Sequence, residues 1–138
     1  MLNNVCLPAV TGGDEKTIAR AQALRKGRDG SYLLKLEGVQ AIVFSPSPAN
    51  PSLCSLTINL DIGQQQPLID ALAGWAAARP APLTPVDQAY QTAGFTSWSW
   101  TSDTSAGHQG LVFNLERTAD GRPIGKGYDV ATVLYSNR

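Results

Sequence analysis

The sequence predicts an α+β fold, a two-layer sandwich in which two helices pack on one face of an antiparallel sheet. Helical periodicity occurs in two separate segments, and each is followed by three segments of strand character, which gives the order α-β-β-β-α-β-β-β. Short, hairpin-like connections within each set of strands favour antiparallel pairing. The length suits a single α+β domain, residues 1–138, with one hydrophobic core.

The first half of the chain is expected to hold one helix and three strands. The helix is predicted over residues 12–26, with Thr11 as N-cap and Gly27 as the C-terminal stop. The strands are predicted over residues 32–37, 39–44 and 53–62. Residues 45–52 contain three prolines and are therefore expected to form a loop. The last strand alternates strongly and places Cys54 on its apolar face.

The second half repeats this order without repeating the sequence. A helix is predicted to open at Pro67, the favoured first helical position, and to end before Pro80. The short polar segment 86–93 is expected to form one or two helical turns. Strands follow over residues 95–102, 111–118 and 128–135. Two hairpin loops, 102–110 and 119–127, connect these strands.

The charge is balanced, with eleven basic and eleven acidic residues. A neutral chain has little electrostatic attraction to nucleic acid, so no nucleic-acid partner is expected. The charges are unevenly placed, because six basic residues lie between Asp14 and Lys35, whereas residues 36–78 contain no Lys or Arg. The basic segment is interpreted as a solvated helix face, with a basic docking face as the alternative. No apolar run is long enough for a transmembrane segment.

Cys6 and Cys54 are the only cysteines. We expect them to form a disulfide that closes a loop of about 50 residues and contributes roughly 3–4 kcal/mol. Such a bond indicates a periplasmic or secreted protein whose signal peptide is absent from this sequence. The alternative is a cytoplasmic protein with two free thiols.

The residues that could carry chemistry do not form a convincing set. His108 is the only histidine, and Asp103 lies close to it in the expected hairpin loop, which seldom supplies the geometry of a catalytic triad. One histidine and two distant cysteines do not suit a zinc site. The acidic residues, Asp129 among them, are scattered and are interpreted as solvated surface acids. We therefore predict no catalytic residue, no metal and no cofactor.

Trp98 and Trp100 are one residue apart and share one face of their predicted strand. Their face is the more apolar one, so burial under the helices is favoured. If the helices instead cover the other face, the two indoles form an exposed surface suited to sugar or peptide recognition.

Several markers along the chain resemble those of small exported proteins and lipoproteins of proteobacteria that have no assigned activity. These markers are Cys6, Pro46–Pro51, Cys54-Ser-Leu-Thr-Ile, Leu68 and Leu72-x-x-Trp75-Ala, Trp100 and the closing strand Val130–Tyr135. The resemblance implies an exported location and supplies no catalytic residues. In architecture alone, the order of helices and strands is also similar to secreted bacterial inhibitors of β-lactamase or lysozyme.

These observations favour a non-enzymatic, exported binding or inhibitor-like protein that recognises a protein or a cell-envelope component. The expected binding residues are Asp103, His108 and Gln109 in one hairpin loop, Arg122 and Lys126 on the neighbouring tip, and Trp98 and Trp100 if they are exposed. The alternative is a small hydrolase or isomerase with Asp or Tyr groups in a pocket between the second helix and the sheet. A structural role in an envelope assembly is a third reading, and the sequence does not predict an oligomeric state.

Overall fold

The computed structural model describes residues 1–36, 39–46, 49–86, 90–92, 94–105 and 107–138. The helical segments are η1 (Leu2–Cys6), α1 (Leu7–Val10), α2 (Glu15–Ala21) and α3 (Gln65–Ala77). The strands are β1 (Arg25–Lys26), β2 (Tyr32–Leu36), β3 (Val39–Pro46), β4 (Leu53–Asp61), β5 (Thr84–Pro85), β6 (Tyr90–Thr92), β7 (Phe95–Thr104), β8 (Gly107–Glu116) and β9 (Tyr128–Asn137).

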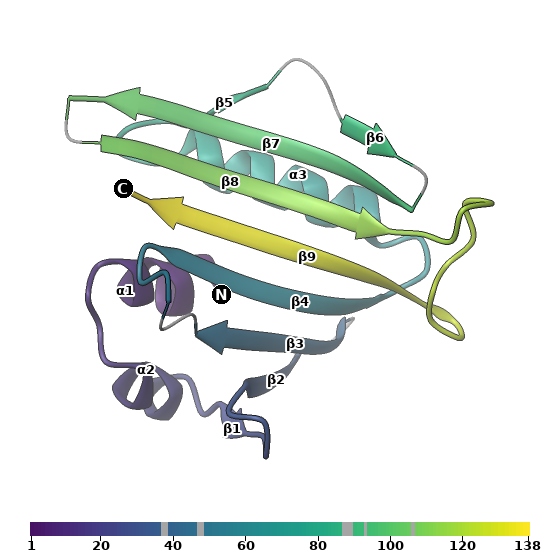
Figure 1. Ribbon diagram of the computed structural model, residues 1–138, viewed down its shortest axis with the longest axis horizontal. Coiled ribbons are helices and arrows are strands. Elements are labelled where there is room, and N and C mark those ends of the chain that lie inside the picture. Colours follow the sequence, from purple (N-terminus) through teal and green to yellow (C-terminus); the bar gives the residue numbers. More distant parts are fainter. Residues whose placement is uncertain (37–38, 47–48, 87–89, 93, 106) are drawn as a thin grey trace.

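Nine strands among the described residues form one antiparallel sheet (Figure 1). Its order is β1-β2-β3-β4-β9-β8-β7-β5, and β6 pairs with the other end of β7. The central strands β4, β9, β8 and β7 have nine or ten residues each. Strands of this length give the middle of the sheet an extent of about 30 Å along the strand direction.

The predicted two-layer α+β sandwich is wrong, because the protein is mostly one antiparallel sheet with short helices. The longest described helix, α3, has 13 residues. Parts of two segments expected to be helical are strands: residues 25–26 form β1, and residues 90–92 form β6. Residues 87–89 and 93 of the second segment lie outside the described residues. Both short strands pair with an edge of the sheet, and this tertiary pairing overrides a weak local helix preference.

Helix α2 is much shorter than the helix predicted over residues 12–26. Its N-cap is Asp14 rather than Thr11, since the Asp14 carboxylate accepts hydrogen bonds from the backbone amide and the hydroxyl of Thr17 at 2.8 and 2.9 Å. These two bonds lower the pKa of Asp14 below its usual 3.8. The helix ends early because Ala23 adopts a positive φ of 52° and the amide of Leu24 bonds back to the carbonyl of Ala19.

One face of the sheet is apolar and carries the core. The alternation predicted for the third strand is confirmed, because Cys54, Leu56, Ile58 and Leu60 of β4 are all buried. Strands β9 and β8 extend this face with Ala131, Val133, Tyr135, Leu111, Phe113 and Leu115. Residues that oppose each other across these strands therefore form continuous apolar rows.

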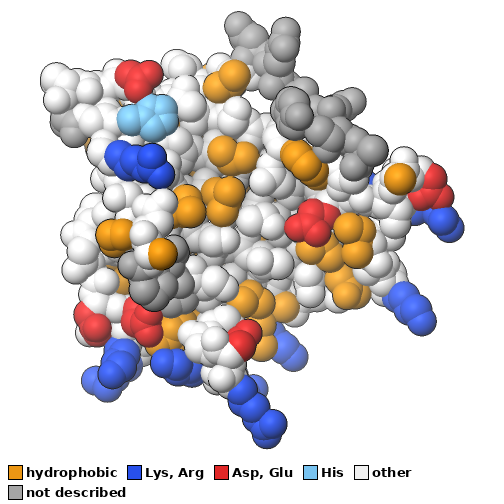
Figure 2. Space-filling model, viewed as in Figure 1, with side chains coloured by type: hydrophobic (Ala, Val, Ile, Leu, Met, Phe, Trp, Pro, Cys, Tyr) orange, Lys and Arg blue, Asp and Glu red, His pale blue; other side chains and the backbone are white. Residues whose placement is uncertain are grey.

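The opposite face of the sheet is largely polar. Thr57, Thr132, Asn114 and Ser97 follow one another across β4, β9, β8 and β7, and each is partly exposed. Figure 2 shows this face as mostly uncharged, with scattered apolar side chains and with Lys and Arg gathered along its lower edge near β1 and β2. Because no described helix covers it, the sheet has one solvated face and one covered face.

The N-terminal segment is helical and packed. Segment η1 buries Leu2, Val5 and Cys6, and α1 contacts β4. Helix α3 lies on the same face over β8, β7 and β5 and is seen behind the sheet in Figure 1. The helical segments therefore cover the two ends of the apolar face separately.

Trp98 and Trp100 both lie on the apolar face, as the sequence favoured. Trp100 is 6% exposed. Trp98 is partly buried, and its ring lies 5.4 Å from that of Phe113 on β8. Trp100 is therefore a core residue and does not form an exposed stacking surface.

Replacing Trp100 with alanine is expected to lower the free energy of unfolding by about 3–5 kcal/mol, because it leaves a large cavity under α3. Urea denaturation followed by circular dichroism measures this change. Ile124, which is exposed on a loop, is the matched site, and Ile124→Ala is expected to change stability little. A Trp100→Ala variant as stable as Ile124→Ala would contradict the burial of this side chain.

Candidate functional site

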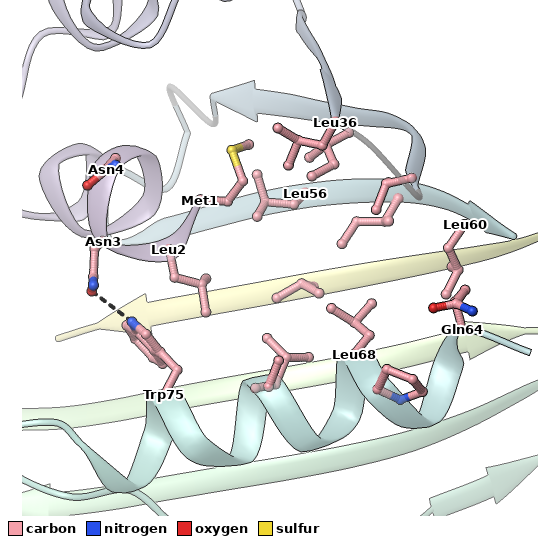
Figure 3. Close-up of a pocket in the computed structure, with 17 residues that line it drawn as sticks. Met1, Leu2, Asn3, Asn4, Leu36, Leu56, Leu60, Gln64, Leu68 and Trp75 are labelled. Carbon is pink, nitrogen blue, oxygen red and sulfur yellow. Dashed lines mark hydrogen bonds between the residues drawn. The ribbon is translucent and has the colours of Figure 1, made fainter.

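An apolar cavity of about 560 Å³ lies between α3, η1 and the covered face of the sheet (Figure 3). Its floor is formed by strands β3, β4 and β9, one wall by α3, and the opposite wall by the β2–β3 edge. The lining residues are Met1, Leu2, Asn3, Asn4, Leu36, Val39, Ile42, Leu56, Ile58, Leu60, Gln64, Pro67, Leu68, Ala71, Leu72, Trp75 and Val133. The cavity lies between the two helical covers of the apolar face, which meet at Asn3 and Trp75.

Two periodicities in the sequence place these side chains. In β4 every second residue points toward the helices, which brings Leu56, Ile58 and Leu60 to the floor. In α3 the residues three and four positions apart share one stripe, so Leu68 and Trp75 face the same space. On the β2–β3 side of this space, Leu36 is 45% exposed.

The end of the cavity near the N-terminus is closed by Trp75. Its indole Nε1 donates a hydrogen bond of 2.7 Å to the Oδ1 atom of Asn3, drawn as a dashed line in Figure 3. The ring is held edge-on to Tyr135 at 5.3 Å, and the guanidinium of Arg79 lies 5.0 Å from its centre. These contacts fix the indole as a wall between α3 and η1.

The Sγ atoms of Cys6 and Cys54 lie 2.03 Å apart, at disulfide-bonding distance. Both side chains are completely buried. The bond connects η1 to β4, the strand that forms the middle of the cavity floor. The expected pairing is therefore present, and it holds the end wall of the cavity against the sheet.

The cavity lining is mostly apolar. The polar side chains among the described lining residues are the amides of Asn3, Asn4 and Gln64, and none of the lining side chains is acidic, basic or phenolic. The pocket considered for a hydrolase or isomerase thus exists between the predicted second helix and the sheet, but its described lining contains none of the expected Asp or Tyr groups. In the part of the chain that the structure describes, no three His, Cys, Asp or Glu residues gather in a way that could hold a metal ion.

Strands β7 and β8 carry the first group of predicted binding residues. Asp103 and His108 were expected in a loop but oppose each other across the two strands, with 2.6 Å between Asp103 Oδ1 and His108 Nδ1. Both are exposed, and Gln109 accepts a hydrogen bond of 3.2 Å from the hydroxyl of Tyr135. The strands extend this far because Gly107 adopts a φ of +139° against the backbone of Arg138, where a Cβ atom would clash.

The second predicted group, Arg122 and Lys126, lies in the loop that follows the opposite end of β8. The ten residues of β8 separate the two groups by about 30 Å. They are not neighbouring tips and do not form one continuous site. Arg122 Nε lies 2.6 Å from Asp120, whose pKa is lowered by hydrogen bonds from Thr118 and, to a smaller extent, Arg122. That either group binds a partner stays a prediction.

No protein-family model and no curated protein matches this chain. Among solved structures, it is similar to LpqN, described as involved in cell envelope biogenesis of Mycobacterium tuberculosis. The TM-score is 0.39 and the identity 13%, over 83% of this chain and 68% of that chain. A similarity of this size identifies neither a family nor a function. This neighbour is a mycobacterial protein, and the resemblance to small exported proteobacterial proteins stays a prediction.

The position of Asp129 differs most from the one predicted from the sequence. Expected as a solvated surface acid, it is completely buried on the apolar face of β9, beside Leu60 of β4. Arg117 Nη2 lies 3.1 Å from both carboxylate oxygens and donates a hydrogen bond to Oδ2. The Oδ1 atom receives no hydrogen bond of good geometry. Neither Asp129 nor Arg117 lines the cavity.

The position of the cavity matches the pocket considered from the sequence, but its apolar lining was missed, although one signal for that lining is present in the sequence. Most of its lining comes from residues 36–75, within the stretch that contains no Lys or Arg. A long segment of strand and helix without cations indicates a surface that is not fully solvated.

No described helix is long and apolar enough to cross a membrane.

Proposed function

We propose that the protein is an exported, non-catalytic binding protein that holds an apolar component of the cell envelope in the cavity between α3, η1 and the sheet. The observation that carries this proposal is the 560 Å³ cavity with its apolar lining and its few amide groups. Small-molecule sites usually have volumes of about 300–1,000 Å³, mostly apolar walls and a few polar groups that orient the ligand.

Burial of hydrocarbon supplies enough free energy for such binding. Each methylene group transferred from water contributes about 0.8 kcal/mol, so eight of them contribute about 6 kcal/mol before the costs of association. The lining also includes exposed side chains such as Leu36 and Pro67, which a ligand would cover. An apolar ligand therefore removes surface from water on both partners.

Export is supported by the paired cysteines. Buried disulfides persist in oxidising compartments such as the periplasm and are rare in the cytosol. A periplasmic or secreted location also gives access to envelope components. We therefore place the protein there, with the envelope component as its partner.

The test is binding of the fluorescent apolar probe N-phenyl-1-naphthylamine. The wild-type protein is expected to enhance its fluorescence saturably. Leu68→Trp places an indole in the cavity and is expected to weaken binding at least ten-fold, since Leu68 points into this space (Figure 3).

Ile124→Trp adds the same indole to an exposed loop and is the matched control, expected to bind the probe as the wild type does. Circular dichroism establishes that both variants are folded. Equal binding by a folded Leu68→Trp variant and by Ile124→Trp, or no binding by the wild type, would contradict the proposed site.

A further inference from the structure

We propose that the ligand is a single-chain amphiphile with an uncharged headgroup, and this inference rests on the proposed function. Its hydrocarbon chain lies along α3 toward Trp75, and its headgroup lies at the end of the cavity marked by Gln64 (Figure 3). Three properties of the cavity lead to this ligand class: its elongated shape, its closed and open ends, and its charge.

The shape favours one extended chain. The lining of α3 runs from Gln64 at its N-cap to Trp75, which corresponds to about 17 Å of helix. An apolar space that is lined along this length of helix suits one extended hydrocarbon chain.

An extended peptide is a poor occupant. Its backbone amides and carbonyls would need hydrogen-bond partners, because unpaired buried polar groups are costly. The lining offers side-chain amides at its ends, from Asn3, Asn4 and Gln64, and apolar side chains between them. A hydrocarbon chain makes no such demand, so it matches the middle of the cavity.

The two ends of the cavity differ. At one end the hydrogen bond between Trp75 and Asn3 joins α3 to η1, and the indole closes the space. At the other end, Gln64 is exposed in the turn that leads from β4 into α3. The terminal methyl group therefore lies toward Trp75, and the polar headgroup lies toward Gln64 and solvent.

The absence of charge in the lining indicates an uncharged headgroup. No Lys or Arg is among the described residues that line the cavity, so the lining offers no cation to pair with an anionic group. Near Gln64, the exposed acids Asp61 and Asp70 accept hydrogen bonds from Gln40 at 3.4 Å and from Gln66 at 2.8 Å. An anion would be repelled by these acids, whereas a cation would find no carboxylate in the lining itself. Amide groups pair well with hydroxyls and esters.

The test compares three amphiphiles of equal chain length, below their micelle concentrations, as competitors of N-phenyl-1-naphthylamine. Monolauroylglycerol is uncharged, laurate is an anion and dodecyltrimethylammonium is a cation. Monolauroylglycerol is expected to displace the probe at a concentration about ten-fold lower than either charged compound. Equal displacement by all three, or stronger displacement by a charged one, overturns the headgroup assignment.

A Gln64→Lys variant locates the headgroup. The new cation is expected to strengthen laurate binding about two- to five-fold, the range for an exposed ion pair, and to leave monolauroylglycerol unchanged. Ser105→Lys, at the β7–β8 turn, adds the same charge elsewhere and is expected to change neither. Equal laurate binding by the two variants overturns the placement of the headgroup at Gln64.

The two proposals fail in distinguishable ways. If Leu68→Trp abolishes probe binding but the three amphiphiles compete equally, the cavity is a binding site and the ligand class is wrong. If the wild-type protein binds neither the probe nor any amphiphile, both proposals fall.

Discussion

Replacing Arg117 with methionine is expected to lower the free energy of unfolding by about 3–5 kcal/mol, because it leaves the Asp129 carboxylate buried without a cation. Asp129 is completely buried, and Arg117 Nη2 lies 3.1 Å from both of its oxygens. Methionine keeps most of the aliphatic stem that packs beside the strand, so the change isolates the charge. Urea denaturation of the two proteins measures the difference.

The double variant Arg117→Met/Asp129→Leu separates loss of the pair from loss of packing. Removing both charges leaves no buried ion, so this variant is expected to recover most of the stability lost by Arg117→Met. Arg122→Met, which removes the exposed partner of Asp120, is the matched control and is expected to change stability little. A double variant no more stable than Arg117→Met would show that the carboxylate is not the source of the loss.

The strands could be predicted from the sequence because alternation with period two is a local signal. The expected strand 53–62 corresponds to β4 (Leu53–Asp61), and the burial of Trp100 follows from the parity of its strand. The prediction for Asp129 was wrong because two signals disagree. The alternation of its strand places this residue on the apolar face, whereas its charge suggested a solvent-exposed position. Its partner, Arg117, follows the other strand of the pair, and single-sequence patterns do not reveal such a pairing.

The helices and the cavity were harder to predict because both depend on tertiary contacts. The end of α2 depends on the positive φ of Ala23, a residue that rarely stops a helix. The helical η1 is stabilised by burial of Val5 and Cys6 rather than by capping residues. The cavity results from the distance between η1 and α3 over the sheet, a property that neither segment encodes alone.

Replacing both Cys6 and Cys54 with alanine is expected to lower the free energy of unfolding by about 4 kcal/mol in the loop-closure model of disulfide stabilisation. The two residues are 48 positions apart, so the bond restricts a large loop of the unfolded chain. Alanine is preferable to serine at these completely buried positions, because it adds no unpaired hydroxyl. Denaturation of the oxidised wild type and of the double variant measures the loss.

The state of the wild-type cysteines is measured by intact mass after alkylation with and without prior reduction. No alkylation before reduction is expected, and two modified thiols in protein purified under oxidising conditions would contradict both the disulfide and the proposed export. Wild-type protein that has been reduced and alkylated at both cysteines is compared with the double variant, and both are expected to be less stable than the oxidised wild type. A double variant as stable as the oxidised wild type would contradict the stabilising role of the disulfide.

The same variant connects the disulfide to the proposed function. Segment η1 supplies Leu2, Asn3 and Asn4 to the cavity, and its covalent attachment to the sheet is the bond at Cys54. Without that bond, the hydrogen bond from Trp75 to Asn3 still joins η1 to α3. Local opening of η1 then costs less, so probe affinity is expected to fall even under conditions where the sheet stays folded. Unchanged affinity in a folded double variant would show that η1 does not need the disulfide to close the cavity.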